Sequence, residues 1–176
     1  MKIRVKELCK GLYTNRDDLF INTKGDCIDL RAAEDYEFNT PQAGRLHQKD
    51  SIKTRDVSVD AKLIKLGIAM QLPKGFVAKI RQRSSTTKKM NLLMATSGFI
   101  DTTYCGDTDE WGLYCIAVGK AAIKKGDRIC QFEIVPSQFA TVWQKLKWLF
   151  SNKIKFEWVD NLGNADRGGH GSTGLK

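Results

Sequence analysis

Two carboxylates of this chain occupy strand-like or hairpin-like stretches, and both could do chemistry. Asp29 lies between two apolar residues in GDCIDLRAA, residues 25–33. A carboxylate there could hold a hard cation such as Mg²⁺, directly or through water, or could simply face outward from a strand. Asp101, in SGFIDTTYCGD (97–107), could orient and deprotonate a water molecule. Aspartate is also common in turns, so Asp101 alone does not decide a function.

A third cluster, RQRSSTTKK (81–89), combines cations and hydroxyls in a way that suits phosphate. Arg83 offers a planar guanidinium fork, and Ser84 and Ser85 add neutral donors. A solvated basic turn explains this stretch equally well. The cluster therefore needs support from other parts of the chain.

The last residues, DRGGHGSTGLK (166–176), gather four glycines around several donors. Glycine lets main-chain N–H groups approach phosphate closely, and Arg167, Ser172 and Thr173 add side-chain donors. The stretch lacks the Gly-Lys-Ser/Thr of a Walker A loop, and no βαβ pattern supports a Rossmann loop. A frayed terminus is the structural alternative.

Short strand-like runs separated by turns surround these clusters. In RICQFEIV (128–135), strand alternation projects Gln131 from the face opposite to its two neighbours, toward either solvent or a ligand. Turns are predicted at LPKGF (72–76) and KKGDR (124–128). With 176 residues, the chain fits one all-β domain, either a sandwich, a jelly roll or a barrel.

Two segments differ from this pattern. Residues 37–57 are polar without a strong period, which predicts a long surface loop. Residues 141–153, TVWQKLKWLFSNK, have apolar residues at helical spacing and predict a short amphipathic helix. We expect its apolar face to pack on the β core; binding a partner or touching a membrane is the lesser alternative.

Composition limits the remaining possibilities. The net charge of +9 suits a polyanionic partner, whether nucleic acid, an anionic membrane surface or a polyphosphate. The five cysteines are odd in number and include no CxxC pair, which argues against a disulfide framework or a zinc site. Reduced thiols predict a cytoplasmic location. We find neither a signal-peptide pattern nor a membrane-spanning run, so no membrane partner is expected.

Taken together and in this order, the five clusters resemble the five motifs of the homotrimeric dUTPases. The resemblance runs from Gly25 to Gly174 and includes LPKGF ahead of the second motif. The wording of IDLRAAED, RSST, KGDRICQF and LGNADRGG is most similar to dUTPases of Bacillus and its phages.

The resemblance implies an all-β, distorted jelly-roll barrel with a short helical insert and a C-terminal arm. Residues 1–162 would form the domain, with the insert near 137–157, and residues 163–176 would form the arm. Three copies would share their active sites in a homotrimer. The implied reaction is Mg²⁺-assisted hydrolysis of dUTP to dUMP and pyrophosphate by water attack on the α-phosphorus. That reaction limits uracil in DNA and supplies dUMP for dTMP synthesis.

Residue roles carry over by position. Asp101 matches the residue that activates the attacking water, and Tyr104 matches the tyrosine under the deoxyribose. The hairpin at 95–100, including Gly98 and Ile100, would read uracil mainly through its main chain.

The remaining matches concern phosphate and metal. Asp29 matches the aspartate near the Mg²⁺ site, where water can intervene. The other implied substrate-binding residues are Arg83, Ser84, Ser85, Gln131, Arg167, His170, Gly171, Ser172 and Thr173.

The C-terminal motif departs from the common family form. His170 stands where most members carry a phenylalanine that stacks on uracil, and the motif is shorter. Trp111, just after the third motif, is the other candidate for this lid, slightly ahead of His170. The structural alternative for Trp111 is a core aromatic.

Three competing functions follow. A dCTP deaminase shares the fold but needs a glutamate base, and the third-motif region offers only Glu110 in a turn-like run. A regulatory protein-binding module with residual dUTPase activity could use the segments at 37–57 and 137–157. Nucleic-acid binding is disfavoured because basic residues and stacking aromatics interleave only around residues 143–156.

Overall fold

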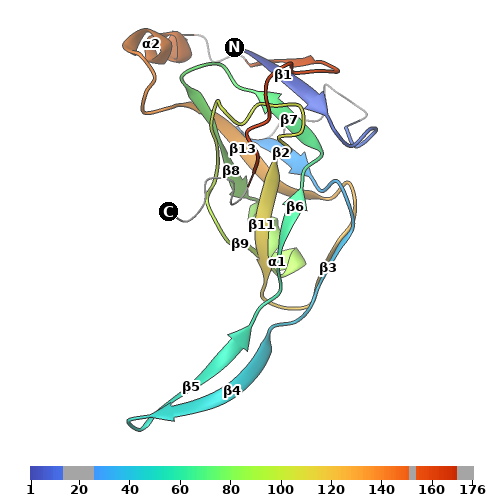
Figure 1. The fold of residues 1–176 in the computed structure, drawn as a ribbon, viewed down its shortest axis with the longest axis vertical. Coiled ribbons are helices and arrows are strands. Elements are labelled where there is room, and N and C mark those ends of the chain that lie inside the picture. The colour runs from blue at the N-terminus through green and yellow to red at the C-terminus, as the bar shows by residue number, and fades with distance from the viewer. Residues whose placement is uncertain (14–25, 151–153, 170–176) are drawn as a thin grey trace.

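Short strands build the described part of the chain, which comprises residues 1–13, 26–150 and 154–169 of a computed structural model (Figure 1). The strands are β1 (Lys2–Glu7), β2 (Ile28–Arg31), β3 (Tyr36–Phe38), β4 (Gln42–Lys49), β5 (Ile52–Ser58), β6 (Ala61–Lys65), β7 (Ile68–Gln71), β8 (Phe76–Gln82), β9 (Leu92–Met94), β10 (Gly98–Ile100), β11 (Gly112–Ala117), β12 (Ala121–Ile123), β13 (Arg128–Pro136) and β14 (Lys155–Trp158). The helices are α1 (Ser84–Met90) and α2 (Val142–Phe150).

Alternation along β8 and β13 explains why these residues form strands. Phe76, Ala78 and Ile80 of β8 are buried, whereas the residues between them are partly exposed. On β13, Phe132 is buried and Gln131 projects from the other face, as predicted. One face of each strand therefore faces the core and the other remains accessible.

The sheet that carries Asp29, Gly98, Ile100 and Gln131 of the predicted site residues has the order β10-β8-β13-β2. All its pairs are antiparallel, and β10 and β2 lie at opposite edges. A three-stranded sheet of order β6-β11-β9, another of order β14-β1-β7 and a two-stranded sheet of β12 and β3 complete the body. The register places Asp29 opposite Gln131, and Gln131 opposite Arg81.

The core lies between these sheets. Trp111 and Phe132 meet edge to face with ring centroids 5.2 Å apart, and both rings are fully buried. Aromatic pairs of this geometry stabilise beyond the area they bury. The all-β prediction is confirmed, and the arrangement is consistent with the predicted jelly-roll barrel.

The segment at 37–57 is not a loop, so that prediction is wrong. After β3, it forms the β4–β5 hairpin, which projects away from the sheets (Figure 1). Asp50 and Ser51 turn the chain with φ of 49° and 66°, the left-handed conformation of a tight hairpin. Every residue of both strands is exposed, so neither face is selected for apolar residues and no alternation reveals the strands.

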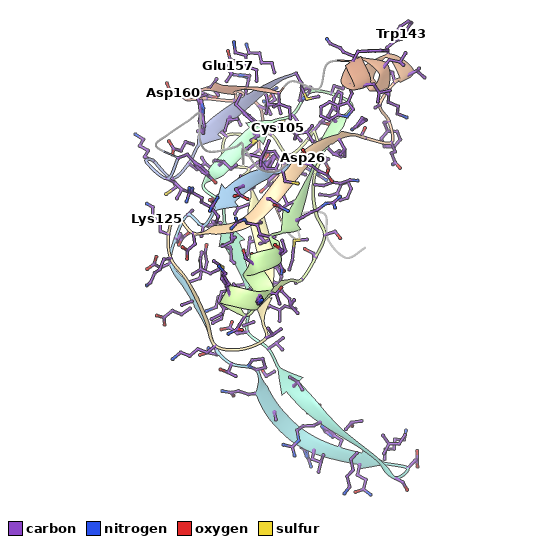
Figure 2. The ribbon with its side chains drawn as sticks, turned by 180° about the vertical axis from the view of Figure 1, so that it is seen from behind. Asp26, Cys105, Lys125, Trp143, Glu157 and Asp160 are labelled. Carbon is purple, nitrogen blue, oxygen red and sulfur yellow. The ribbon has the colours of Figure 1, made fainter. Side chains whose placement is uncertain are left out.

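The amphipathic helix is confirmed as α2, but its expected packing is wrong. Trp143 is 81% exposed and Phe150 is 86% exposed. Figure 2 shows Trp143 on the outer side of the helix. Among the aromatic side chains of α2, Trp148 alone stacks on a ring of the described body, with its ring centroid 5.7 Å from that of Phe76. Gln144 fixes this orientation by donating to the carbonyl of Lys74 at 2.8 Å, which turns most of the apolar face outward.

Helix α1 was not predicted, because RSSTTKK reads locally as a polar turn. The buried Thr86 hydroxyl donates to the carbonyl of Ile129 at 2.8 Å, and Asn91 ends the helix in the left-handed conformation. All five cysteines are free thiols. No helix in the described residues is long and apolar enough to cross a membrane.

Candidate active site

A pocket of about 270 Å³ opens beside β10. It brings together five of the predicted site residues, drawn from two regions of the chain. They are Gly98, Ile100, Asp101, Tyr104 and Arg167. Side chains suited to proton transfer and phosphate binding thus share one wall with exposed main chain.

The wall at 95–100 is not a hairpin, contrary to expectation. Strand β9 pairs with β11 in one sheet, whereas β10 pairs with β8 in another, so the chain crosses between sheets. Gly98 is required at the crossing, because a Cβ there would lie 2.7 Å from the Cβ of Ile80. Because Gly98 has no side chain, its main chain lines the pocket directly, which suits recognition of a flat base.

Asp101 lies at the pocket between two sets of donors. Its Oδ1 accepts a hydrogen bond from the main-chain N–H of Thr103 at 2.8 Å and another from the Thr103 hydroxyl at 2.5 Å. Its Oδ2 lies 2.6 Å from Nη1 of Arg167. Partial burial alone would raise the pKa of Asp101, but these donors outweigh it and hold the pKa below its usual range. The carboxylate is therefore ionised at neutral pH.

Tyr104 forms another part of the wall. Its hydroxyl donates to the carbonyl of Glu110 at 2.8 Å, which fixes the ring. Burial and the neighbouring carboxylates of Asp109 and Glu110 raise the pKa of this hydroxyl, so it stays protonated. A fixed, neutral aromatic ring is suited to pack against a sugar.

Carboxylates of the loop after Tyr104 hold the C-terminal segment against the body. Asp107 accepts from the N–H of Leu162 at 2.8 Å and from Lys6 Nζ at 2.9 Å. Asp109 accepts from the N–H of Arg167 at 3.0 Å. Neither residue was predicted as part of the site, although three acidic side chains in GDTDE (106–110), at the end of the third motif, are an unusual density of charge for a short loop.

Asp29 belongs to a second cluster, separate from the pocket. Its side chain is 6% exposed and lies 3.0 Å from Arg83 Nε and 3.0 Å from Arg128 Nη1. Gln131 is its partner on the neighbouring strand. Two guanidinium groups thus neutralise one buried carboxylate.

Ser84 and Ser85 begin α1 directly after Arg83, so they accompany this second cluster. None of its members lines the pocket. Adjacent strands lie about 4.8 Å apart, so β2 and β10 at opposite edges are separated by about 14 Å. One copy of the chain therefore divides the predicted residues between two places.

The donors around Asp29 do not fit a directly bound cation. Arg83 Nε lies 3.0 Å from Oδ1 and Arg128 Nη1 lies 3.0 Å from Oδ2, although Oδ1 accepts no hydrogen bond from the described residues. A cation bound directly to Asp29 would have to displace or repel these guanidinium groups. Within the described ranges, no three metal-ligating side chains gather in one group. The structure therefore gives no support to Asp29 as a direct Mg²⁺ ligand.

Trp111 does not reach the pocket as a lid, which corrects one of the two alternatives. The ring is fully buried and packs edge to face against Phe132, so it lies in the core. His170, Gly171, Ser172 and Thr173 lie outside the described residues.

The sequence of this chain is similar to those of curated proteins that share one name. No model of a protein family matches the chain. The SPbeta prophage-derived deoxyuridine 5'-triphosphate nucleotidohydrolase YosS of Bacillus subtilis is 39% identical over 179 residues, covering all of both chains. The deoxyuridine 5'-triphosphate nucleotidohydrolase of Maricaulis maris is 33% identical over 164 residues, covering 85% of this chain and 97% of its own.

Solved structures support the fold. The dUTPase of Staphylococcus aureus phage phi11, described with a structural Mg(II) ion, has a TM-score of 0.57 at 18% identity, covering 80% of this chain and 94% of its own. The dUTPase of Staphylococcus bacteriophage 80alpha bound to dUpNHpp has a TM-score of 0.56 at 18% identity, covering 98% of both chains. These likenesses concern the overall arrangement of the chain.

Proposed function

Since this chain belongs to the dUTPase family, we propose that it hydrolyses dUTP to dUMP and pyrophosphate. One observation of the structure supports the proposal independently of family membership. The pocket combines the ionised carboxylate of Asp101, the fixed ring of Tyr104 and the guanidinium of Arg167 beside the main chain of Gly98. These groups match the needs of water activation, sugar packing, phosphate binding and base reading.

The chemistry follows from these positions. Asp101 accepts a proton from a water molecule, which attacks the α-phosphorus in line while pyrophosphate leaves. Arg167 donates to phosphate oxygens and stabilises their charge. The ring of Tyr104 packs under the deoxyribose and leaves little room for a 2′-hydroxyl.

The two separate clusters support a homotrimer with shared sites. In one chain, Arg83 and Gln131 lie away from a phosphate held beside Asp101. Arg83 follows the far end of β8, five residues beyond Ala78, the partner of Ile100, and Gln131 lies on β13, two strands away from β10. A neighbouring copy could supply them. Co-expressing Asp101→Asn with Arg83→Ala tests this arrangement, since mixed trimers would contain some intact sites. Activity above that of either variant alone is expected; its absence would argue for sites within one chain.

A divalent cation is best treated as part of the substrate. The residues around Asp29 do not fit a direct ligand set, and a triphosphate can bring Mg²⁺ with it. This chain's own contribution is then to bind and orient the phosphates with Arg167 and the residues of the second cluster.

A dCTP deaminase activity has one observation in its favour, because Glu110 lines the pocket. However, Glu110 Oε1 accepts from the N–H of Gly67 at 2.9 Å, which engages the carboxylate in a structural contact. Ammonia release from dCTP would support deamination, whereas pyrophosphate release from dUTP supports the proposal.

The decisive experiment measures pyrophosphate release from dUTP with Mg²⁺ for the wild type and Asp101→Asn. Losing a general base typically costs about 10²–10⁴-fold in rate, and we expect a loss in that range. Equal rates in the two proteins would overturn the mechanism.

Two further parts of the proposal have indirect support. The free thiols fit a cytoplasmic location. The exposed apolar side chains of α2 offer a place for a regulatory protein, and related phage dUTPases are described as controlling the transfer of virulence genes.

A further inference from the structure

A buried carboxylate outside the reacting groups links the loop at 105–110 to the C-terminal segment. Asp109 is 1% exposed, yet no Lys, Arg or His pairs with it in the part of the chain that the structure describes. A buried carboxylate without a cation needs other donors to offset its lost hydration. Its contacts therefore indicate what it does.

Main-chain N–H groups are those donors. Asp109 Oδ2 accepts from Gly106 at 2.8 Å and from Arg167 at 3.0 Å, and Oδ1 accepts from Gly168 at 3.1 Å. The carboxylate thus joins its own loop to two consecutive residues of the C-terminal segment. Hydrogen bonds to a charged acceptor are stronger than neutral ones.

Close approach of the two segments depends on a neighbouring glycine. A Cβ on Gly106 would collide with the main chain of Asp166, whose N would lie 2.7 Å away. Asp166 in turn accepts from the N–H of Thr108 at 2.7 Å. The loop, which begins near Cys105 (Figure 2), and the segment before Arg167 are therefore fitted to each other.

From these contacts we propose that Asp109 is a positioning residue, which holds the main chain of Arg167 so that its guanidinium reaches Asp101 and the pocket. The proposal rests on the proposed function, because the placement of Arg167 matters only if the pocket binds a triphosphate. Asp109 itself touches no reacting group. It acts through Arg167.

The chemistry requires a carboxylate at this position. Three N–H donors converge on two oxygens, and an asparagine would replace one acceptor with a donor. The amide of Asp109→Asn would then face an N–H group of Gly106, Arg167 or Gly168. Arg167 and Gly168 would lose this anchor, while Asp107 would still hold Leu162 and Gly163.

A double-mutant cycle in the full-length chain tests the proposal. The loss of hydrogen bonds to a charged group predicts that Asp109→Asn lowers kcat/KM for dUTP by about 10- to 100-fold. In an Arg167→Ala background the same change should cost little, because the residue through which Asp109 acts is already gone. Equal losses in both backgrounds would overturn the proposal.

Asp107→Asn is the matched control. Asp107 belongs to the same loop and also holds the C-terminal segment, but through Leu162 and Gly163. It should lower thermal stability with little effect on kcat/KM. If Asp107→Asn and Asp109→Asn reduce kcat/KM equally, Asp109 has only a structural role and the proposal fails.

Hydrogen exchange in the wild-type protein provides a test that needs no variant. The N–H groups of Arg167 and Gly168 should exchange more slowly than in an unstructured peptide, and exchange at the peptide rate would overturn the proposal even if Asp109→Asn does not fold. A wild type that releases no pyrophosphate would instead refute the proposed function. Exchange would still report whether Asp109 holds the segment.

Discussion

Arg167 Nη1 lies 2.6 Å from Asp101 Oδ2, although the two residues are 66 positions apart in the sequence. A guanidinium from the C-terminal segment thus contacts the carboxylate of Asp101, which we propose activates water. Both side chains remain partly open to solvent, at 42% and 47% exposure, so substrate can reach them. Phosphate oxygens entering the pocket would compete with Asp101 for this guanidinium.

Replacing Arg167 should change the pH dependence of catalysis. The guanidinium helps to hold the pKa of Asp101 below its usual range, so Arg167→Ala should raise that pKa. Asp101 must be ionised to accept a proton, and the acidic limb of kcat/KM against pH should therefore move to higher pH. Steady-state kinetics across the acidic range measures this shift.

A remote cation provides the control for that shift. Lys124 pairs with Asp35 on the surface, so Lys124→Ala removes a positive charge without touching Asp101. The acidic limb should stay in place. A similar movement in both variants would show that net charge, and not the contact with Asp101, is responsible.

Trp111 should behave as a core residue. Deleting a fully buried aromatic ring costs about 3–5 kcal/mol, so Trp111→Ala should reduce the free energy of unfolding by a similar amount. Trp111→Phe keeps a ring against Phe132 and should leave KM for dUTP unchanged. A raised KM in a Trp111→Phe protein of normal stability would restore Trp111 as the lid.

Two tryptophans of α2 should differ sharply in their effect on stability. Trp143 is 81% exposed, and surface changes usually alter the free energy of unfolding by less than about 0.5 kcal/mol, so Trp143→Ser should be near neutral. Trp148 stacks on Phe76, and losing that partly buried ring should cost about 1–3 kcal/mol in Trp148→Ala. Chemical denaturation compares them. Equal losses would mean that the apolar face of α2 is covered.

Asp29 should matter for binding and stability and not as a cation ligand. Asp29→Asn weakens two ion pairs at a buried carboxylate, which should cost about 1–3 kcal/mol of stability. The Mg²⁺ concentration that gives half-maximal activity should match that of Asp26→Asn, an exposed neighbour on the same segment. If this Mg²⁺ concentration rises for Asp29→Asn but not for Asp26→Asn, Asp29 acts near the metal, and its pairing with Arg83 and Arg128 does not explain its role.

Much of the architecture was accessible from sequence because it depends on local alternation. β8 and, from Cys130 onward, β13 bury alternate residues, and this alternation can be recognised in the sequence. The β4–β5 hairpin escaped prediction because neither of its faces is buried. The outward orientation of the apolar face of α2 was not predicted, because periodicity identifies an apolar face but does not show whether another element covers it.

For the site, the sequence by itself determined which residue types were available: a carboxylate at Asp101, an aromatic ring at Tyr104 and a guanidinium at Arg167, each within a short recognisable motif. Only the tertiary structure decided which of them meet. Asp101 and Arg167 come together because the carboxylate of Asp109 holds the main chain of Arg167 against the loop after Tyr104. Such contacts join distant parts of the chain, and they stabilise the protein only after both segments have folded against one another.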